Sequence, residues 1–279
     1  MTIRIVTDST CDLPPEVIQE NEITVIPILI HMGEKEYRDG VDLTRAEFYG
    51  QLPHLRPAPT TAAPGPQVFR EVYERLGAEG ATEILSIHIS HKLSAIMEVA
   101  RQAAAETHSV PVTAFDSRQL SLGTGFTVLA AAQAAKQGRS LHAILELLEE
   151  QMARTHVFAA LDTIEFMRRG GRMNGAIIAL GTLLKVKPLL KMYNGEAGAE
   201  RVRTRSGAIH RLKEMLARHA PYETLAVLHS SAEARAKALL EEVRHLLPAG
   251  EIWMQEINPV LGAHIGPGVV GFACISKHN

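Results

Sequence analysis

The chain has 279 residues, which is enough for one large domain or two domains of moderate size. Hydrophobic residues make up 46% of the sequence and charged residues 22%, as in an ordinary globular protein. The formal net charge of -2 and the aromatic content of 5% argue against a nucleic-acid partner, which requires excess positive charge and stacking surfaces.

Cysteine usage and the start of the sequence bear on the compartment. Cys11 and Cys274 stand near opposite ends of the sequence and form no CxxC pair, which favours a reducing compartment over a disulfide scaffold. The stretch "MTIRIVTDST" lacks the apolar core of a signal peptide, and no apolar run is long enough to span a bilayer. We therefore expect a cytoplasmic protein with no transmembrane segment.

The first half of the sequence alternates β-branched runs with segments of helical periodicity. Helices are expected at residues 94–106 and 122–138, and strands at 3–9, 23–30, 83–90 and 110–117. Pro27 indicates an edge or a bulge in the second of these strands. Strands that alternate with helices of this length predict βαβ units, and therefore a mostly parallel α/β/α domain, which we assign to residues 1–160.

The second half shows a different pattern. A helix at residues 141–152 is followed by short segments, which include a hairpin at 185–205 with an Asn-Gly turn and two short helices around a Gly-rich turn in 164–184. The remaining expected elements are strands at 157–163, 225–230, 252–258 and 268–276, and helices at 206–220 and 232–247. This mixture predicts a C-terminal α+β domain with a mixed or antiparallel sheet, which we assign to residues 161–279.

The stretch "PAPTTAAPGP" at residues 57–66 places two adjacent threonines between four prolines. A segment so rich in proline cannot form a core helix or a central strand. Its stiffness fixes the directions of the Thr60 and Thr61 hydroxyls, which matters where a ligand has to be held.

Other polar motifs have two interpretations each. The carboxylates of "TDSTCDLP" at residues 7–14 could bind a metal or cap the helix expected to follow. His88 and His91 face opposite sides if the strand continues, which disfavours a shared metal. The arginines in "RRGGR" (168–172) and "RVRTR" (201–205) could form a solvated face or bind a carboxylate or phosphate.

Taken together, the motifs resemble those of the DegV family of fatty-acid-binding proteins, and the resemblance extends over essentially the whole chain. The motifs are "TDSTCDLP" (7–14), "PTTAAPGP" (59–66), "ISHKLSAIMEVA" (89–100), "FDSRQLSLGTG" (115–125), "RRGGRM" (168–173), "LLKVKPLL" (183–190), "RVRTRSGAI" (201–209) and "HIGPGVVG" (264–271).

The resemblance implies a lipid carrier with no cofactor and no catalytic residues, rather than an enzyme. It implies that one long-chain fatty acid, such as palmitate, stearate or oleate, lies between the two domains. Its carboxylate would bind Thr61 and Ser94, with Thr60 adjacent, and His264 matches the family's head-group histidine. A separate fatty acid kinase would then convert the carboxylate to an acyl-phosphate.

For the kinase or the transferred phosphoryl group, the resemblance implies contacts from Arg172, Arg203 and Arg205. The sequence departs from the family pattern at Ala62 and Ala95, where serine and glycine are usual, which leaves the acyl-chain preference open. Small side chains in "FTVLAAAQAA" (126–135) and "FAAL" (158–161) could line an apolar tunnel for the chain.

A different class of function remains as the alternative. Asp8 and Asp116, together with the arginines, could serve a metal-dependent phosphotransferase or hydrolase. The sequence contains no Walker A motif and no GxSxG elbow, which argues against this alternative.

Overall fold

The structure is a computed structural model that describes residues 2–171, 187–193, 195–248, 250 and 252–278. The chain divides into two compact units, of which the first comprises Met1–Leu29 and Ala62–Ala153 and the second comprises Ile30–Thr61 and Arg154–Asn279. The expected division at residue 160 differs from these units in one large segment, because Ile30–Thr61 groups with the second unit. That segment lies between the strands of the first unit in the sequence, so sequence order alone could not assign it.

The first unit is built on a parallel four-stranded sheet in the order β2-β1-β6-β7. Its strands are β1 (Ile3–Asp8), β2 (Thr24–Ile26), β6 (Glu83–His88) and β7 (Val112–Asp116). This confirms the predicted parallel sheet. The strand expected at 23–30 is divided at Pro27, since β2 ends at Ile26 and β3 begins at Leu29.

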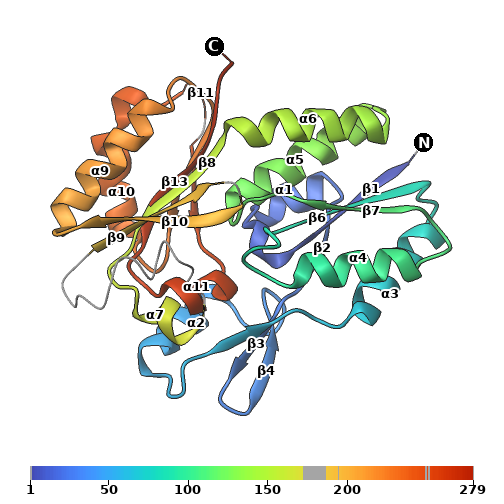
Figure 1. Ribbon diagram of the computed structural model, residues 1–279, viewed down its shortest axis with the longest axis horizontal. Helices are drawn as coiled ribbons and strands as arrows, with labels where there is room; N and C mark the ends of the chain where they lie inside the picture. Colours follow the sequence, from blue (N-terminus) through green and yellow to red (C-terminus); the bar gives the residue numbers. More distant parts are fainter. Residues whose placement is uncertain (1, 172–186, 194, 249, 251, 279) are drawn as a thin grey trace. The chain divides into compact units, whose positions relative to one another are not determined.

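Helices cover both faces of this sheet, with α3 and α4 on one side and α5 and α6 on the other (Figure 1). The helices of the first unit are η1 (Ser9–Cys11), α1 (Pro15–Glu20), α3 (Pro66–Ala78), α4 (Ile96–Glu106), α5 (Leu122–Lys136) and α6 (Leu141–Arg154). The alanine-rich part of α5 is largely buried, including Ala131, Ala132 and Ala134. The predicted α/β/α arrangement is therefore confirmed.

The second unit is built on a mixed six-stranded sheet in the order β10-β9-β8-β13-β11-β12, in which only β11 and β12 pair in parallel. Its strands are β8 (Thr155–Ala160), β9 (Lys187–Tyr193), β10 (Glu196–Val202), β11 (Tyr222–His229), β12 (Trp253–Glu256) and β13 (Val270–Ser276). The expected mixed sheet is confirmed, and so is the hairpin, in which Tyr193 pairs with Glu196.

The second unit also contains a three-stranded sheet in the order β4-β3-β5. Its strands are β3 (Leu29–Met32), β4 (Lys35–Arg38) and β5 (Thr60–Ala62). The helices are α2 (Arg45–Gln51), η2 (Leu52–His54), α7 (Glu165–Arg169), α9 (Arg205–Arg218), α10 (Glu233–Glu242), η3 (Arg244–Leu246) and α11 (Pro259–Ile265). Of the two short helices expected in 164–184, α7 is present and the second falls outside the described residues.

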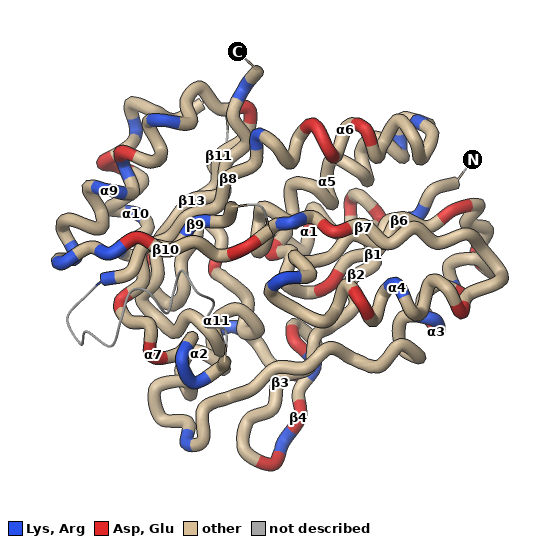
Figure 2. The backbone as a smooth tube through the Cα atoms, viewed as in Figure 1, with Lys and Arg blue, Asp and Glu red and all other residues tan. Residues whose placement is uncertain are grey.

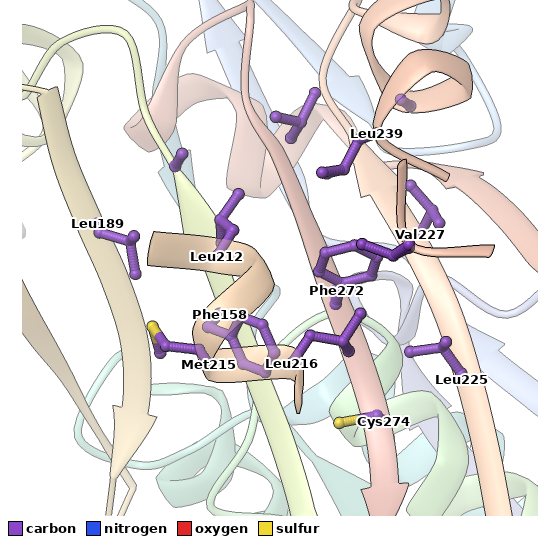
Figure 3. Close-up of a cluster of buried hydrophobic side chains, with 14 of the residues drawn as sticks. Phe158, Leu189, Leu212, Met215, Leu216, Leu225, Val227, Leu239, Phe272 and Cys274 are labelled. Carbon is purple, nitrogen blue, oxygen red and sulfur yellow. The ribbon is translucent and has the colours of Figure 1, made fainter. Parts of the chain in front are cut away.

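The core of the second unit lies between the six-stranded sheet and helices α9 and α10 (Figure 3). Phe158 on β8 and Phe272 on β13 have ring centroids 5.9 Å apart, and Leu212 and Leu216 of α9 are fully buried beside them. The strands β8 and β13 contain no charged residue, whereas α9 has many (Figure 2). In the described part of the chain, no helix is both long and apolar enough to cross a bilayer.

Candidate ligand-binding site

The proline-rich segment at residues 57–66 contains a short strand, Thr60–Ala62, at the edge of the three-stranded sheet. This strand, β5, holds Thr60 and Thr61 and follows the buried Pro59. Successive residues of a strand point to opposite faces, so the two hydroxyls diverge. Thr60 is exposed and Thr61 is half-buried. The fold thus separates the two adjacent threonines, and Thr61 is the one that meets another candidate residue.

Thr61 contacts His264, which is 203 positions away in the sequence. The Oγ1 atom of Thr61 lies 2.9 Å from Nε2 of His264, and both residues belong to the second unit. The imidazole is 8% exposed, so its surroundings hold it in place. Two of the residues predicted for the carboxylate site are therefore joined by a direct hydrogen bond.

The position of the imidazole proton decides what Thr61 can offer to a ligand. When Nε2 bears the proton it donates to Thr61, and the threonine O–H is then available to an anion. When Nε2 bears no proton, Thr61 has to donate to it instead. A carboxylate at Thr61 therefore favours the forms of His264 that have a proton on Nε2.

His264 lies on α11, a short helix that is fixed at its first turn. The Oδ1 atom of Asn258 accepts a hydrogen bond from the backbone N–H of Leu261 at 2.9 Å. Pro259 occupies the first helical position, where an N–H would have no partner in the helix. The hydroxyl of Tyr49 on α2 donates to the carbonyl of Ile257 at 2.9 Å, which ties the start of this segment to α2.

The end of α11 is fixed by Ser230, which is fully buried after β11. The Ser230 hydroxyl donates to the carbonyl of Gly266 at 2.7 Å and accepts from the N–H of Val269 at 3.0 Å. The backbone carbonyl of Ser230 accepts from the N–H of Gly268 at 2.7 Å. Both ends of the helix that holds His264 are thus anchored.

Ser94 lies in the first unit, in the loop between β6 and α4. It is half-buried, and its Oγ accepts a hydrogen bond from the N–H of Ile96 at 3.3 Å, so it supports the start of α4. The N–H of Ser94 donates to the carbonyl of Ser90 at 3.2 Å. A hydroxyl that accepts through one lone pair retains its proton for donation to a ligand. Ala95, which replaces the usual glycine, is exposed.

The predicted arginines have different surroundings. Arg203 is exposed directly after β10, and Arg205 is the first residue of α9, with a side chain that is 58% exposed. The Nη2 atom of Arg205 donates to Oδ2 of Asp162 at 2.9 Å. Arg172 lies outside the described residues.

Asp162 is the centre of a small ionic cluster in the second unit. Besides Arg205, the Nη1 atom of Arg235 donates to its Oδ2 at 3.1 Å, and Nζ of Lys187 lies 3.6 Å from its Oδ1. Arg235 also donates to the carbonyl of Gly268, in the turn after α11. Three cations therefore surround one carboxylate beside that turn.

Asp8, a carboxylate of the metal-dependent alternative, has protein partners. It is fully buried, and it accepts from Nδ1 of His88 at 2.9 Å and from the N–H of Thr10 at 3.0 Å. Burial alone would raise the pKa of Asp8, but the bonds from His88 and Thr10 outweigh it and lower that pKa. The Nε2 atom of His88 lies 2.7 Å from Oγ of Ser86, which lies 2.8 Å from the hydroxyl of Tyr73.

Asp116 also has protein partners. Its Oδ2 lies 2.5 Å from Nδ1 of His91, and its Oδ1 accepts from the N–H of Arg118 at 2.9 Å. His88 and His91 thus pair with different aspartates. In the described ranges no group of three or more His, Cys, Asp or Glu side chains could hold a metal ion. Nothing in the described geometry favours the metal-dependent alternative.

Sequence reasoning did not identify Ser230, Asn258 or Tyr49, which fix α11. An Asn followed by Pro is a helix-start signal, so "NP" at residues 258–259 could have predicted α11. Ser230 and Tyr49 act through contacts between distant segments, and no local signal marks them.

Comparisons with known proteins show which family the chain resembles. A family model described as "Uncharacterised protein, DegV family" matches residues 2–277. A DegV domain-containing protein of Streptomyces coelicolor is 36% identical over 280 residues, which cover 99% of each chain. Protein DegV of Bacillus subtilis is 33% identical over 283 residues, which cover 99% of this chain and 100% of that protein.

Two solved structures are similar over almost the whole chain. A DegV family protein from Thermus thermophilus, whose structure is described as one of fatty acid binding, matches with a TM-score of 0.89 and 36% identity. DegV of Bacillus subtilis, described as a fatty acid binding protein, matches with a TM-score of 0.90 and 32% identity. Each match covers 99% of this chain and 100% of the other.

Proposed function

The chain belongs to the DegV family, and from that premise we propose that it binds one long-chain fatty acid and presents it to a fatty acid kinase. The main support is the hydrogen bond of 2.9 Å between Thr61 and His264, because it joins a hydroxyl and an imidazole from distant parts of the sequence. The related proteins of Thermus thermophilus and Bacillus subtilis are described as binding fatty acids. In this proposal the chain is a carrier, and the kinase supplies the ATP chemistry.

The carboxylate of the fatty acid would bind at Thr61. Burying a carboxylate is costly unless several donors meet it. The Thr61 hydroxyl donates one charge-assisted bond, while His264 donates to Thr61 from Nε2 and adds positive charge when protonated. Ser94 is kept as a second hydroxyl donor on the strength of the resemblance. Thr60 is the less suitable donor to the carboxylate, because its hydroxyl points away from that of Thr61.

The acyl chain would lie on the face of the six-stranded sheet that bears Ala159. Phe158 and Ala160 belong to the core on the α9 and α10 side, so Ala159 points to the opposite face. There its cross-strand neighbours are Gly271 of β13 and Leu190 of β9, so the surface beside it is apolar. Each buried methylene contributes about 0.8 kcal/mol, so about fourteen of them give roughly 11 kcal/mol before immobilisation costs. Ala131 is fully buried within α5, which makes Ala159 the better position for a blocking substitution.

The kinase would transfer the γ-phosphoryl group of ATP to the bound carboxylate. A carboxylate oxygen forms the new bond to phosphorus, and ADP leaves. Arg203, Arg205 and Arg172 are proposed to contact the kinase or the phosphoryl group, because guanidinium groups suit phosphate and carboxylate geometry. Arg203 and Arg205 are exposed, as such contacts require.

Titration of a fluorescent C16 fatty acid tests the carboxylate site. Thr61→Val, which removes the hydroxyl at nearly constant volume, should weaken binding about ten- to a hundredfold, as expected for a bond to a charged group. Ser94→Ala and His264→Ala should also weaken it. Thr60→Val is the matched control and should remain near wild type. Wild-type affinity in Thr61→Val, Ser94→Ala and His264→Ala together would refute the proposal.

Acyl-phosphate formation with the cognate kinase tests the presenting role. Arg203→Glu and Arg205→Glu should reduce turnover while lipid binding persists. Arg218→Glu is a suitable control, because Arg218 is exposed at the far end of α9. Unchanged turnover in both Arg203→Glu and Arg205→Glu would remove these residues from the kinase contact.

A further inference from the structure

Gly170 ends α7 in a conformation that does not require glycine. Its φ of -81° and ψ of 0° are accessible to other residues, and its N–H donates to the carbonyl of Phe166 at 2.9 Å. The adjacent Gly171 differs, because its φ is +69° and a Cβ there would meet no atom of the described residues within 4 Å. Backbone conformation therefore accounts for Gly171 but not for Gly170.

The feature that excludes a side chain at position 170 is the imidazole of His264. A Cβ built on Gly170 would overlap Nδ1 of His264 and lie 3.1 Å from its Cε1. The opposite edge of the same ring bears Nε2, which bonds Thr61. A methyl group at position 170 would therefore displace the ring and disturb the bond to Thr61.

The helix α11 has little room to relieve this overlap by moving as a whole. On the α7 side, a Cβ on Gly266 would overlap the ring of Phe166. On the α2 side, a Cβ on Gly262 would lie 2.5 Å from the hydroxyl oxygen of Tyr49 and 2.9 Å from its Cζ. The helix is in close contact with its neighbours on both sides, so the side chain of His264 is the group that has to move.

We propose that Gly170 is a positioning residue for the carboxylate site, since its missing side chain leaves the space in which the imidazole of His264 bonds Thr61. The link to a carboxylate rests on the proposed function, whereas the position of the ring is a property of the protein without ligand. Gly171, the second glycine of "RRGG", thus allows the left-handed turn. Gly170, the first, leaves room for the imidazole of His264.

The experiment compares Gly170→Ala with Gly50→Ala. Gly50 lies in α2, and a Cβ there would meet nothing within 4 Å in the part of the chain that the structure describes, so the control adds the same methyl group in open space. Two quantities are measured on the full chain: the ¹⁵N chemical shifts of the His264 ring, assigned with His264→Ala, and the affinity for a fluorescent C16 fatty acid. Gly170→Ala should move the ring signals without ligand and weaken binding about tenfold or more, and Gly50→Ala should do neither.

The double variant Gly170→Ala/His264→Ala shows whether the effect passes through the histidine. It should bind the lipid no more weakly than His264→Ala alone, and it should recover the melting temperature that Gly170→Ala loses. If Gly170→Ala does not fold, the test is whether the double variant, which lacks the imidazole, folds again. Unmoved ring signals, additive binding losses or no thermal recovery would overturn the inference. Moved ring signals in a protein that binds no fatty acid would refute the proposed function but retain the positioning role.

Discussion

A histidine bonded to a hydroxyl occurs in both units, and the two pairs have different surroundings. In the first unit His88 is fully buried, with Nδ1 bonded to Asp8 at 2.9 Å and Nε2 to Ser86 at 2.7 Å. In the second unit His264 bonds Thr61, whose side chain is only half-buried. A hydrogen-bonded chain sealed in the core stabilises the fold, whereas a half-buried hydroxyl can also meet a ligand.

The buried hydrogen bonds surround an ionised carboxylate. The lowered pKa of Asp8, which its bonds from His88 and Thr10 cause against the effect of burial, keeps the carboxylate ionised. Nδ1 of His88 therefore donates to it, and Nε2 lies within hydrogen-bond distance of the Ser86 hydroxyl. Burial raises the pKa of Tyr73, so its phenol stays protonated beside the Ser86 hydroxyl. Each group in this chain already has its partner, although it resembles a Ser-His-Asp catalytic set.

The largest expected effect is the loss of stability when this chain is broken. Asp8→Ala leaves His88 and the N–H of Thr10 without their acceptor in the core, which should cost about 3–5 kcal/mol of unfolding free energy. Thr61→Val removes a half-buried hydroxyl and should cost about 1 kcal/mol or less. Urea denaturation of both variants measures the difference.

Ligand affinity should show the reverse order. Among folded variants, Thr61→Val should weaken lipid binding more than a change in the buried hydrogen-bonded chain does. Ser86→Ala, a milder change in the buried chain, should leave lipid affinity near wild type at the same time as it lowers stability. Equal costs in stability for Asp8→Ala and Thr61→Val would contradict the contrast between a sealed and a half-buried pair.

A pair of stacked imidazoles in the second unit is expected to make the stability of the fold depend on pH. His156 and His219 stack with ring centroids 3.6 Å apart. Burial, with His219 beside it, lowers the pKa of His156 to about 4, and burial with Arg218 nearby lowers the pKa of His219. The unfolded chain takes up protons on these residues near pH 6.5. Their contribution to stability is therefore complete above that pH and is lost as the pH falls toward about 4.

The expected loss from this pair is about 1–2 kcal/mol between pH 7 and pH 4, discounted for the solvent that reaches both rings. His156→Gln, which cannot take up a proton, should show a smaller decrease of unfolding free energy over that interval. Urea denaturation at pH 7, 6, 5 and 4 compares the two proteins. Parallel pH profiles would show that the stacked rings do not contribute.

Most strands and helices of the fold were predictable because their signals are local, but β4, β5, α2 and α3 were not among the expected elements. The hydrophobic periods located β1, β6, β7 and the mixed sheet, and Pro27 marked the gap between β2 and β3. The assignment of Ile30–Thr61 to the second unit was not predictable, because it depends on contacts such as that from Tyr49 to Ile257. Such contacts join residues that are far apart in the sequence.

The candidate site was predictable in its residue types but not in its geometry. Proline around Thr60 and Thr61 indicated a fixed loop, and the family resemblance supplied Ser94 and His264. The bond between Thr61 and His264 needs the folded chain, as does the divergence of Thr60. The role of Asp162 was missed, because its three cations come from separate segments.

Asp162, like Asp8, is an aspartate with several partners, but it retains contact with solvent. Its side chain is 25% exposed, and that of its partner Arg205 is 58% exposed, whereas Asp8 and His88 are fully buried. Exposed ion pairs contribute little, because water and salt screen them.

Asp162→Asn should therefore lower the unfolding free energy by only about 1 kcal/mol or less, several times less than Asp8→Ala. The Arg235 side chain also donates to the carbonyl of Gly268, and that bond does not need the carboxylate. The remaining effect is electrostatic, so it should shrink further in about 0.5 M NaCl, where the screening length is only a few ångströms. Urea denaturation at low and high salt measures both quantities. A loss of about 3 kcal/mol that is independent of salt would mean that Asp162 stabilises the turn after α11 as a buried group, in the way that Asp8 stabilises the first unit.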